Sequence, residues 1–150
     1  MRGVPGIAAF ALALVLLLPG LSEGACSITT TGVSFGAYNV FDSTPVDSTG
    51  SVRYQCSGST VSFTIRLSTG SGATFNPRSM LVGASALNYN LYLDAARISI
   101  WGDGTSGTSF FLATNPSGKA VNVPIFGRIL AGQDVAAGSY SDSIVVTIQF

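Results

Sequence analysis

The sequence predicts an all-β sandwich with Greek-key connections, and three observations lead to this prediction. Apolar and polar residues alternate strictly in several short runs, of which VSFTIRL at 61–67 is the clearest. Clusters of Gly, Pro, Asn and Ser separate these runs. Ser, Thr, Gly and β-branched or aromatic residues dominate the composition, whereas helix-forming residues are scarce. Alternation places successive side chains on opposite faces of a strand, and short strands at this spacing are typical of sandwiches.

Residues 1–24 form a predicted signal peptide, which leaves a single predicted domain at 25–150. Arg2 gives the leader a positive start, and IAAFALALVLLL at 7–18 is its apolar region. Small residues stand at 22 and 24, so we expect cleavage after Gly24. This apolar run is shorter than the roughly 20 residues that cross a bilayer, and no later run approaches that length. The sequence therefore predicts export without direct membrane insertion.

Six or seven strands are expected in this domain, each an alternating or apolar run between turn residues. In chain order they cover residues 26–35, 51–57, 61–68, 87–93, 97–101, 121–128 and 143–150. The apolar positions of the alternating sets are Val52, Tyr54 and Cys56; Val61, Phe63, Ile65 and Leu67; Leu87, Tyr89, Leu91 and Leu93; Val121, Val123 and Ile125; and Ile144, Val146, Ile148 and Phe150. The turn clusters between them lie at 57–59, 70–72, 76–77, 102–104, 115–118 and 137–138.

The two cysteines of an exported chain predict one disulfide, Cys26–Cys56. Two alternative readings are weaker. A metal site would need more ligands than two thiols in a chain without histidine. A redox pair usually has its cysteines closer together in sequence. No metal and no cofactor is therefore expected.

The final alternating run ends at Phe150, and this position bears on function. A sandwich whose last strand is also a chain end can leave the neighbouring strand position empty. Such a vacancy exposes unpaired backbone groups and core side chains, and a strand from another polypeptide can fill it. The pattern allows this vacancy without requiring it.

Several segments are informative when taken together and in order. They are FGAY at 35–38, LNYNLY at 87–92, WGDGT at 101–105, FGRI at 126–129, GQ at 132–133, AGSYSD at 137–142 and VVTIQF at 145–150. With the spacing of the two cysteines, this series resembles the spore coat protein U domain family, which is related to the archaic chaperone–usher pilins. The resemblance covers essentially the whole predicted domain.

The resemblance implies an immunoglobulin-like sandwich that lacks its final strand. Members of such families pass through the periplasm with a dedicated chaperone and are assembled by an outer-membrane usher into surface pili or coats. Sister subunits donate the missing strand. The acceptor groove would then lie beside the terminal strand, with Ile144, Val146, Ile148 and Phe150 as candidate residues. Gly127, Gly138 and Tyr140 would shape the turn that leads into it.

Polymerising subunits of this type carry an N-terminal extension that serves as the donor strand. Here Cys26 would be about the second residue after cleavage, which leaves no room for a donor. We therefore expect an acceptor-only subunit, either tip-like or terminating, or a coat protein that does not polymerise by this route.

Charge and residue types argue against several other functions. The chain has seven basic and seven acidic residues with a net charge of zero, which does not suit nucleic acid. The chain has no histidine, and its single glutamate, Glu23, lies in the leader. Most catalytic sites that use acid–base or nucleophilic catalysis would therefore lack a required residue. Most of the aspartates stand beside Gly or Ser, where Asp is an ordinary turn residue. No enzymatic activity is expected.

The loop around Trp101 and Asp103 carries the alternative function. A tryptophan beside polar loops can stack on a sugar, which would make the domain a self-sufficient adhesive or carbohydrate-binding module. The plainer interpretation, which we favour, is a turn with Trp101 packed in the core. Asp103 alone falls short of the six to eight oxygens that calcium requires. Tyr140, shortly before the last strand, is a candidate for a tyrosine-corner hydrogen bond.

Overall fold

A computed structural model describes residues 26–57, 62–114 and 118–150. This part of the chain contains eight strands and no helix. The strands are β1 (Cys26–Thr31), β2 (Val46–Cys56), β3 (Phe63–Leu67), β4 (Arg78–Val82), β5 (Ser85–Tyr92), β6 (Phe111–Ala113), β7 (Val121–Ile129) and β8 (Val146–Gln149). The predicted signal peptide, Val61 and the turn residues 58–59 and 115–117 lie outside the described residues.

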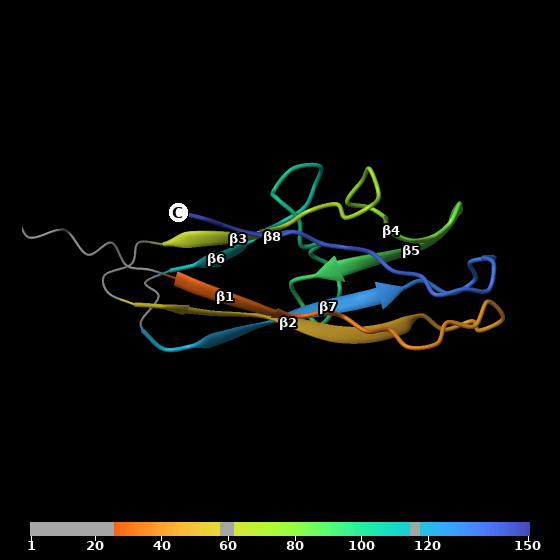
Figure 1. Cartoon of the computed structure of the whole chain (residues 1–150), viewed down its shortest axis with the longest axis horizontal. Helices are drawn as coiled ribbons and strands as arrows, with labels where there is room; N and C mark the ends of the chain where they lie inside the picture. Colours follow the sequence, from red (N-terminus) through yellow and green to blue (C-terminus); the bar gives the residue numbers. More distant parts are fainter. Residues whose placement is uncertain (1–25, 58–61, 115–117) are drawn as a thin grey trace, which may run out of the picture.

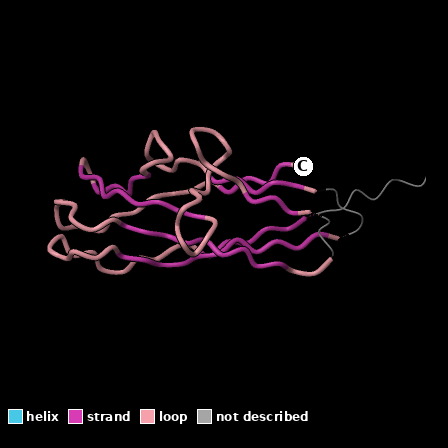
Figure 2. Tube along the Cα trace, turned by 180° about the vertical axis from the view of Figure 1, so that it is seen from behind, coloured by secondary structure: helices cyan, strands magenta, loops and turns pink. Residues whose placement is uncertain are grey.

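The strands form two sheets. The larger has the order β1-β2-β7-β5-β4, and the smaller has the order β6-β3-β8. Every strand pair is antiparallel. The strands run along the long axis of the molecule (Figure 1), and Figure 2 shows from behind that loops gather above the sheets and at one end. The predicted all-β sandwich is confirmed.

Several expected strands differ from the observed ones. The predicted strand at 97–101 is wrong, because Arg97 has a φ of 59° and only Ile100 and Trp101 form isolated bridges. The carboxylate of Asp94 instead accepts hydrogen bonds from the backbone N–H groups of Ile98 and Ser99, which closes a loop there. β4 and β6 were not predicted.

β4 and β5 form a tight hairpin. Val82 pairs with Ser85, so only two residues make the turn. Gly83 has a φ of 55°, which glycine adopts without a steric penalty. This hairpin adds a pair of strands to the edge of the larger sheet, opposite β1.

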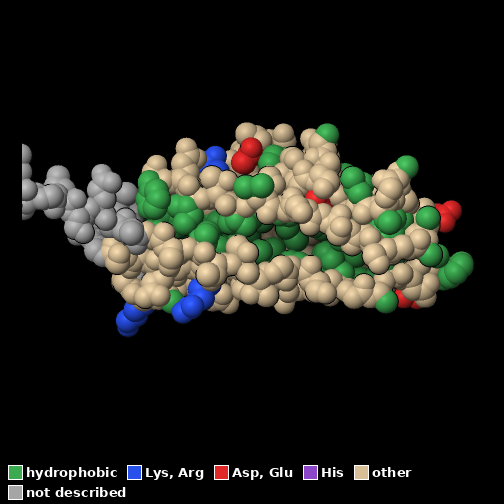
Figure 3. Space-filling model, viewed as in Figure 1, with side chains coloured by type: hydrophobic (Ala, Val, Ile, Leu, Met, Phe, Trp, Pro, Cys, Tyr) green, Lys and Arg blue, Asp and Glu red, His purple; other side chains and the backbone are tan. Residues whose placement is uncertain are grey.

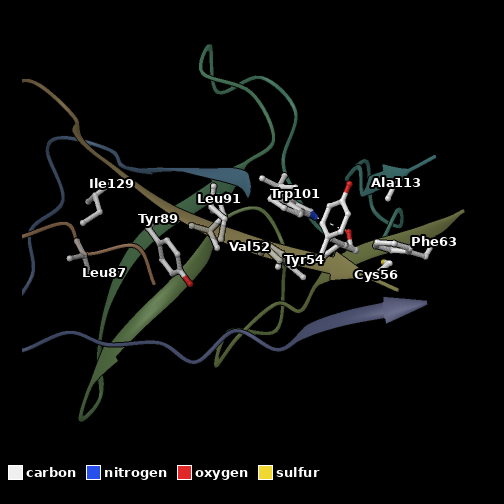
Figure 4. Packing of buried hydrophobic residues seen from close by; sticks show 14 residues of the cluster. Val52, Tyr54, Cys56, Phe63, Leu87, Tyr89, Leu91, Trp101, Ala113 and Ile129 are labelled. Carbon is white, nitrogen blue, oxygen red and sulfur yellow. Dashed lines mark hydrogen bonds between the residues drawn. The ribbon is translucent and has the colours of Figure 1, made fainter. Parts of the chain in front are cut away.

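The inward-facing residues of both sheets form one core (Figure 4). Trp101 is completely buried, and its indole N–H donates a hydrogen bond to the carbonyl of Ile65 at 2.9 Å. The ring of Tyr54 from β2 meets that of Phe63 from β3 edge to face at 5.1 Å. Contacts of this kind join the two sheets and give Trp101 a structural role.

The predicted disulfide is confirmed. Cys26 and Cys56 are bonded and lie directly opposite each other in the β1–β2 pairing. The bond ties the first residue of β1 to the last residue of β2. It therefore anchors the start of the domain to the larger sheet.

Candidate functional site

A long apolar groove lies between two segments that are far apart in the sequence. Its volume is about 980 Å³. One side is residues 30–40, here called the first wall, and the other lies within residues 135–146, here called the second wall. In the space-filling view, a band of hydrophobic side chains runs along the length of the molecule between these two sides (Figure 3).

The floor of the groove is the core itself. It is formed by apolar or aromatic residues of β3, β4, β5 and β7, namely Leu67, Met80, Leu87, Tyr89, Leu91, Ile125 and Ile129. Most of these side chains are otherwise buried between the sheets. The groove is therefore an opening between the two sheets through which the sandwich interior can be reached.

β8 borders this opening with an edge that pairs with no described strand. It stands last in the smaller sheet, where its strand neighbour is β3. Ile144, Val146 and Ile148 are half-buried against the core, whereas Val145 between them is 63% exposed. An unpaired edge with alternate apolar side chains is the arrangement to which another strand can add.

The four candidate acceptor residues do not all lie in the groove. Ile144 and Val146 line it. Ile148 packs against the core but is not among the lining residues. Phe150 is 65% exposed, and its ring centre lies 5.6 Å from that of Phe63.

The role predicted for Gly127 is wrong, because this residue is not in a turn. It lies within β7, paired with Ser48 on one side and Leu91 on the other. A Cβ at this position would come within 2.7 Å of the side chains of Phe35 and Val33. The absence of a side chain lets the first wall rest on β7.

Gly138 and Tyr140 do belong to the second wall. The hydroxyl of Tyr140 donates to the carbonyl of Ala136 at 2.8 Å, and it shares a 2.6 Å hydrogen bond with the hydroxyl of Ser85. The first bond links Tyr140 to the backbone four residues upstream, as in the tyrosine corner for which Tyr140 was a candidate. The second joins the second wall to the start of β5.

A second tyrosine, Tyr38, lines the groove from the first wall. The hydroxyl of Tyr38 donates to the carbonyl of Leu130 at 3.2 Å and accepts from the N–H of Gln133 at 2.8 Å. The side-chain amide of Gln133 bonds both the N–H and the carbonyl of Asn88, each at 2.8 Å. Sequence reasoning singled out both residues as family motifs without assigning them this role.

Asp142 connects the second wall to the floor. One carboxylate oxygen accepts from the backbone N–H groups of Ser71 and Ser143, at 2.6 and 2.7 Å. The other accepts from the hydroxyl of Tyr89 at 2.6 Å. Burial, together with this carboxylate, raises the pKa of the Tyr89 hydroxyl far above its usual value. The tyrosine therefore remains a hydrogen-bond donor.

The loop at Trp101 does not offer a sugar-binding platform. Because Trp101 is 0% exposed, its ring has no free face for stacking. Two hydrogen bonds from Thr105 hold the pKa of the Asp103 carboxyl below its usual value, as in an ordinary polar turn. Over the described ranges, no three acidic or cysteine side chains come together in a way that could hold a metal ion.

The described residues also include no helix of the length and apolar character needed to span a bilayer.

Comparisons with known proteins agree with this geometry. The family model of the Spore Coat Protein U domain matches residues 13–147. "Protein U" of Myxococcus xanthus is 38% identical over 144 residues, which cover 85% of this chain and 78% of that protein.

Two solved structures from pilus proteins are similar to this chain, and the first shares its fold. One is the CsuC–CsuE chaperone–tip adhesion subunit pre-assembly complex of archaic chaperone-usher Csu pili from Acinetobacter baumannii, with a TM-score of 0.61 and 24% identity. The match covers 85% of this chain but only 40% of that one. Another is the E. coli Hda pilus minor tip subunit HdaB, with a TM-score of 0.42, 16% identity, and 81% and 79% of the two chains covered.

Proposed function

This chain belongs to the Spore Coat Protein U domain family, and from that premise we propose that it is an exported structural subunit of a surface pilus or coat. Its groove accepts a strand from another polypeptide. The observation that carries the proposal is the edge of β8 that pairs with no described strand, beside an open apolar groove between the sheets.

The chemistry of the groove favours a strand over a small molecule. A strand along β8 would pair with its free backbone groups, and its alternate side chains would cover the floor. Four or five inserted apolar side chains would contribute roughly 6–15 kcal/mol before ordering costs. This gain is comparable with the whole stability of an ordinary domain, which is about 5–15 kcal/mol.

The proposal names three kinds of partner. A periplasmic chaperone would occupy the groove first, because the similar tip adhesion subunit was solved together with its chaperone. An outer-membrane usher would then mediate assembly, and a sister subunit would replace the chaperone strand with its own. The chain would pass through the periplasm and finish on the cell surface or in an extracellular appendage.

We also propose that the chain accepts a strand but gives none. With cleavage after Gly24, only Ala25 would precede Cys26, and from Cys26 the chain is committed to β1. Amino-terminal sequencing of the surface-extracted protein tests the cleavage position. Immunogold labelling tests the role: label at tips or ends is expected, and label repeated along a shaft contradicts it.

Site-specific crosslinking tests the strand-accepting function directly. A photo-crosslinking amino acid replaces Ala37, an exposed residue that lines the groove. The matched control replaces Ala84, an exposed residue of the β4–β5 turn that does not line it. An affinity tag is inserted between Lys119 and Ala120, which are both exposed and outside the groove.

After irradiation of living cells, the proposal predicts a defined covalent adduct from position 37 and none from position 84. Mass spectrometry of the adduct should locate the crosslink in an alternating strand of another polypeptide. Equal adducts from both positions, or a crosslink to a segment without alternation, contradict the proposal. Recovery of an adduct-free, stable monomer from the cell surface contradicts it as well.

A further inference from the structure

The second wall is held by few backbone contacts. At one end Val146 pairs with Leu67 of β3, and at the other Ser141 forms an isolated bridge with Leu81 of β4. Between them, Val145 exchanges hydrogen bonds with Ser68, through that residue's N–H and its hydroxyl. The segment around Asp142 therefore depends on side-chain bonds for its position.

The carboxylate of Asp142 supplies these bonds. It accepts hydrogen bonds from the N–H of Ser71, the N–H of Ser143 and the hydroxyl of Tyr89, all within 2.7 Å. Hydrogen bonds to an ionised group are roughly twice as strong as neutral ones. Gly70 has a φ of 77° and lies against the same carboxylate, so a Cβ there would overlap it. The loop after β3 is thus shaped around Asp142.

Tyr89 extends this connection across the groove. It belongs to the floor, is 5% exposed, and meets the ring of Phe35 in the first wall edge to face at 5.9 Å. Phe35, Tyr89 and Asp142 therefore form a crossbar from the first wall, over the floor, to the second wall. The only hydrogen bond in the crossbar is that between Tyr89 and Asp142.

We infer that this crossbar keeps the groove open while no strand occupies it, and that Tyr89 and Asp142 are positioning residues for strand entry. This inference rests on the strand-accepting function proposed above. Water disfavours the half-buried apolar side chains that line the groove, such as Val33 and Ile144, so the hydrophobic effect favours inward collapse of the second wall. The hydrogen bond between Tyr89 and Asp142 opposes that collapse. After a strand has entered, its ladder along β8 and the residues that precede β8 holds the second wall, and the crossbar is no longer needed.

The hydrogen bond between Tyr89 and Asp142 should affect the rate at which a strand enters the groove. If only the open form admits a strand, the apparent affinity falls in proportion to the open fraction. Loss of the hydrogen bond lowers the ratio of open to closed molecules by a factor on the order of ten for a bond to a charged group. The open fraction, and with it the association rate constant, should therefore fall by up to this factor. The dissociation rate constant should not change, because the bound strand itself holds the wall.

Binding kinetics of the full mature chain test this. The probe is a synthetic peptide of alternating valine and threonine, about twelve residues long, which matches the length of the walls at ~3.3 Å per residue. The variants are Tyr89→Phe, which keeps the ring against Phe35, and Asp142→Ala. The control is Tyr92→Phe, since Tyr92 is a β5 residue that does not line the groove. Thermal unfolding of each variant is recorded alongside.

Tyr89→Phe and Asp142→Ala should associate with the peptide more slowly than wild type, by up to about tenfold, and dissociate at its rate. Asp142→Asn should recover part of the loss, because its amide oxygen still accepts and its NH₂ can donate to the Tyr89 oxygen. Tyr92→Phe should bind like wild type.

Unchanged association in both folded variants overturns the inference. Faster dissociation with unchanged association also overturns it, since the residues would then be contacting the strand. A variant that unfolds more easily yet binds at wild-type rates shows a purely structural role and counts against the inference. Failure of the wild type to bind the peptide contradicts the strand-accepting function itself, which is a different result. If Asp142→Ala does not fold, the comparison of Tyr89→Phe with Asp142→Asn decides the matter.

Discussion

At the scale of single residues, small changes in side-chain volume decide how the first wall lies. Gly127 faces the core within β7, and the side chains of Val33 and Phe35 lie over it. Phe35 can reach Tyr89 because it occupies this space. Gly32, in the same wall, has no atom within 4 Å of where its Cβ would be. The two glycines therefore differ in what a methyl group would meet.

Gly127→Ala should lower the free energy of unfolding by about 1–3 kcal/mol, because the added methyl group displaces Phe35 or Val33 from a packed position. Gly32→Ala is the matched control and should change it by less than about 0.5 kcal/mol. Urea unfolding followed by tyrosine and tryptophan fluorescence measures both. Equal stability of the two variants would show that the first wall can shift without cost.

Residue patterns in the sequence predicted one side of the groove better than the other. Alternation at 143–150 predicted that Ile144 and Val146 lie on one face of the last strand, and the family resemblance put the groove beside that strand; both residues line the groove. The crossbar could not be predicted in this way. Tyr89 and Asp142 are 53 positions apart, and neither local pattern shows that they meet. Gly127 was assigned to a turn on the family resemblance, and the residue type could not correct this, because glycine in a sequence does not distinguish a turn from a close approach of another segment.

At the scale of elements, prediction succeeded where strands are long and half-buried. β3 and β5 and the second half of β2 show clear alternation, and the structure has strands there. β6 has three residues, which is too short to display a period. β4 begins with Arg78, which is buried and donates to the carbonyls of Ser68 and Trp101 and to the amide oxygen of Asn90. A buried arginine interrupts the apolar pattern that a sequence search relies on.

An ion-pair cluster joins two elements of the larger sheet to a loop. Arg128 in β7 donates to both carboxylate oxygens of Asp47 in β2, at 2.7 and 2.8 Å, and Arg97 lies 3.3 Å from the same carboxylate. The hydrogen bond from Arg128, with the positive charges of Arg128 and Arg97, lowers the pKa of Asp47 below its usual 3.8. The folded state therefore favours ionised Asp47 more than the unfolded state does.

The sign of the pH effect follows from that direction. Above about pH 4 the cluster contributes fully, and its contribution is lost as the pH falls through the lowered pKa of folded Asp47. Asp47→Asn should therefore remove part of the acid dependence of unfolding, by less than about 1 kcal/mol because the cluster is partly exposed. Asp134→Asn, an exposed carboxylate outside the cluster, is the control. Denaturant midpoints between pH 2 and pH 7 test this, and parallel profiles for wild type and Asp47→Asn contradict it.

At the scale of the whole molecule, the groove and the disulfide have opposite effects on the stability of the domain. An open groove leaves part of the core uncovered along the long axis (Figure 3). The Cys26–Cys56 bond closes a loop with a sequence separation of 30, which is worth ~3–4 kcal/mol in the chain-entropy model. The bond stabilises the larger sheet but covers nothing in the groove. On the proposed function, a domain of this kind needs a further strand to reach ordinary stability.

This need can be tested within one chain. An alternating valine–threonine strand, joined to Phe150 through a short Gly/Ser linker, can fold back antiparallel along the free edge of β8. It should raise the free energy of unfolding by several kcal/mol, since it adds ladder hydrogen bonds and covers half-buried groove residues such as Met80 and Val146. The matched control carries proline at the threonine positions, which removes N–H donors while retaining the valines. Guanidinium unfolding compares the two fusions with the unmodified chain. A gain that the proline fusion shares would mean that the groove binds apolar chain without a strand ladder, and no gain in either fusion would mean that the sandwich is already complete.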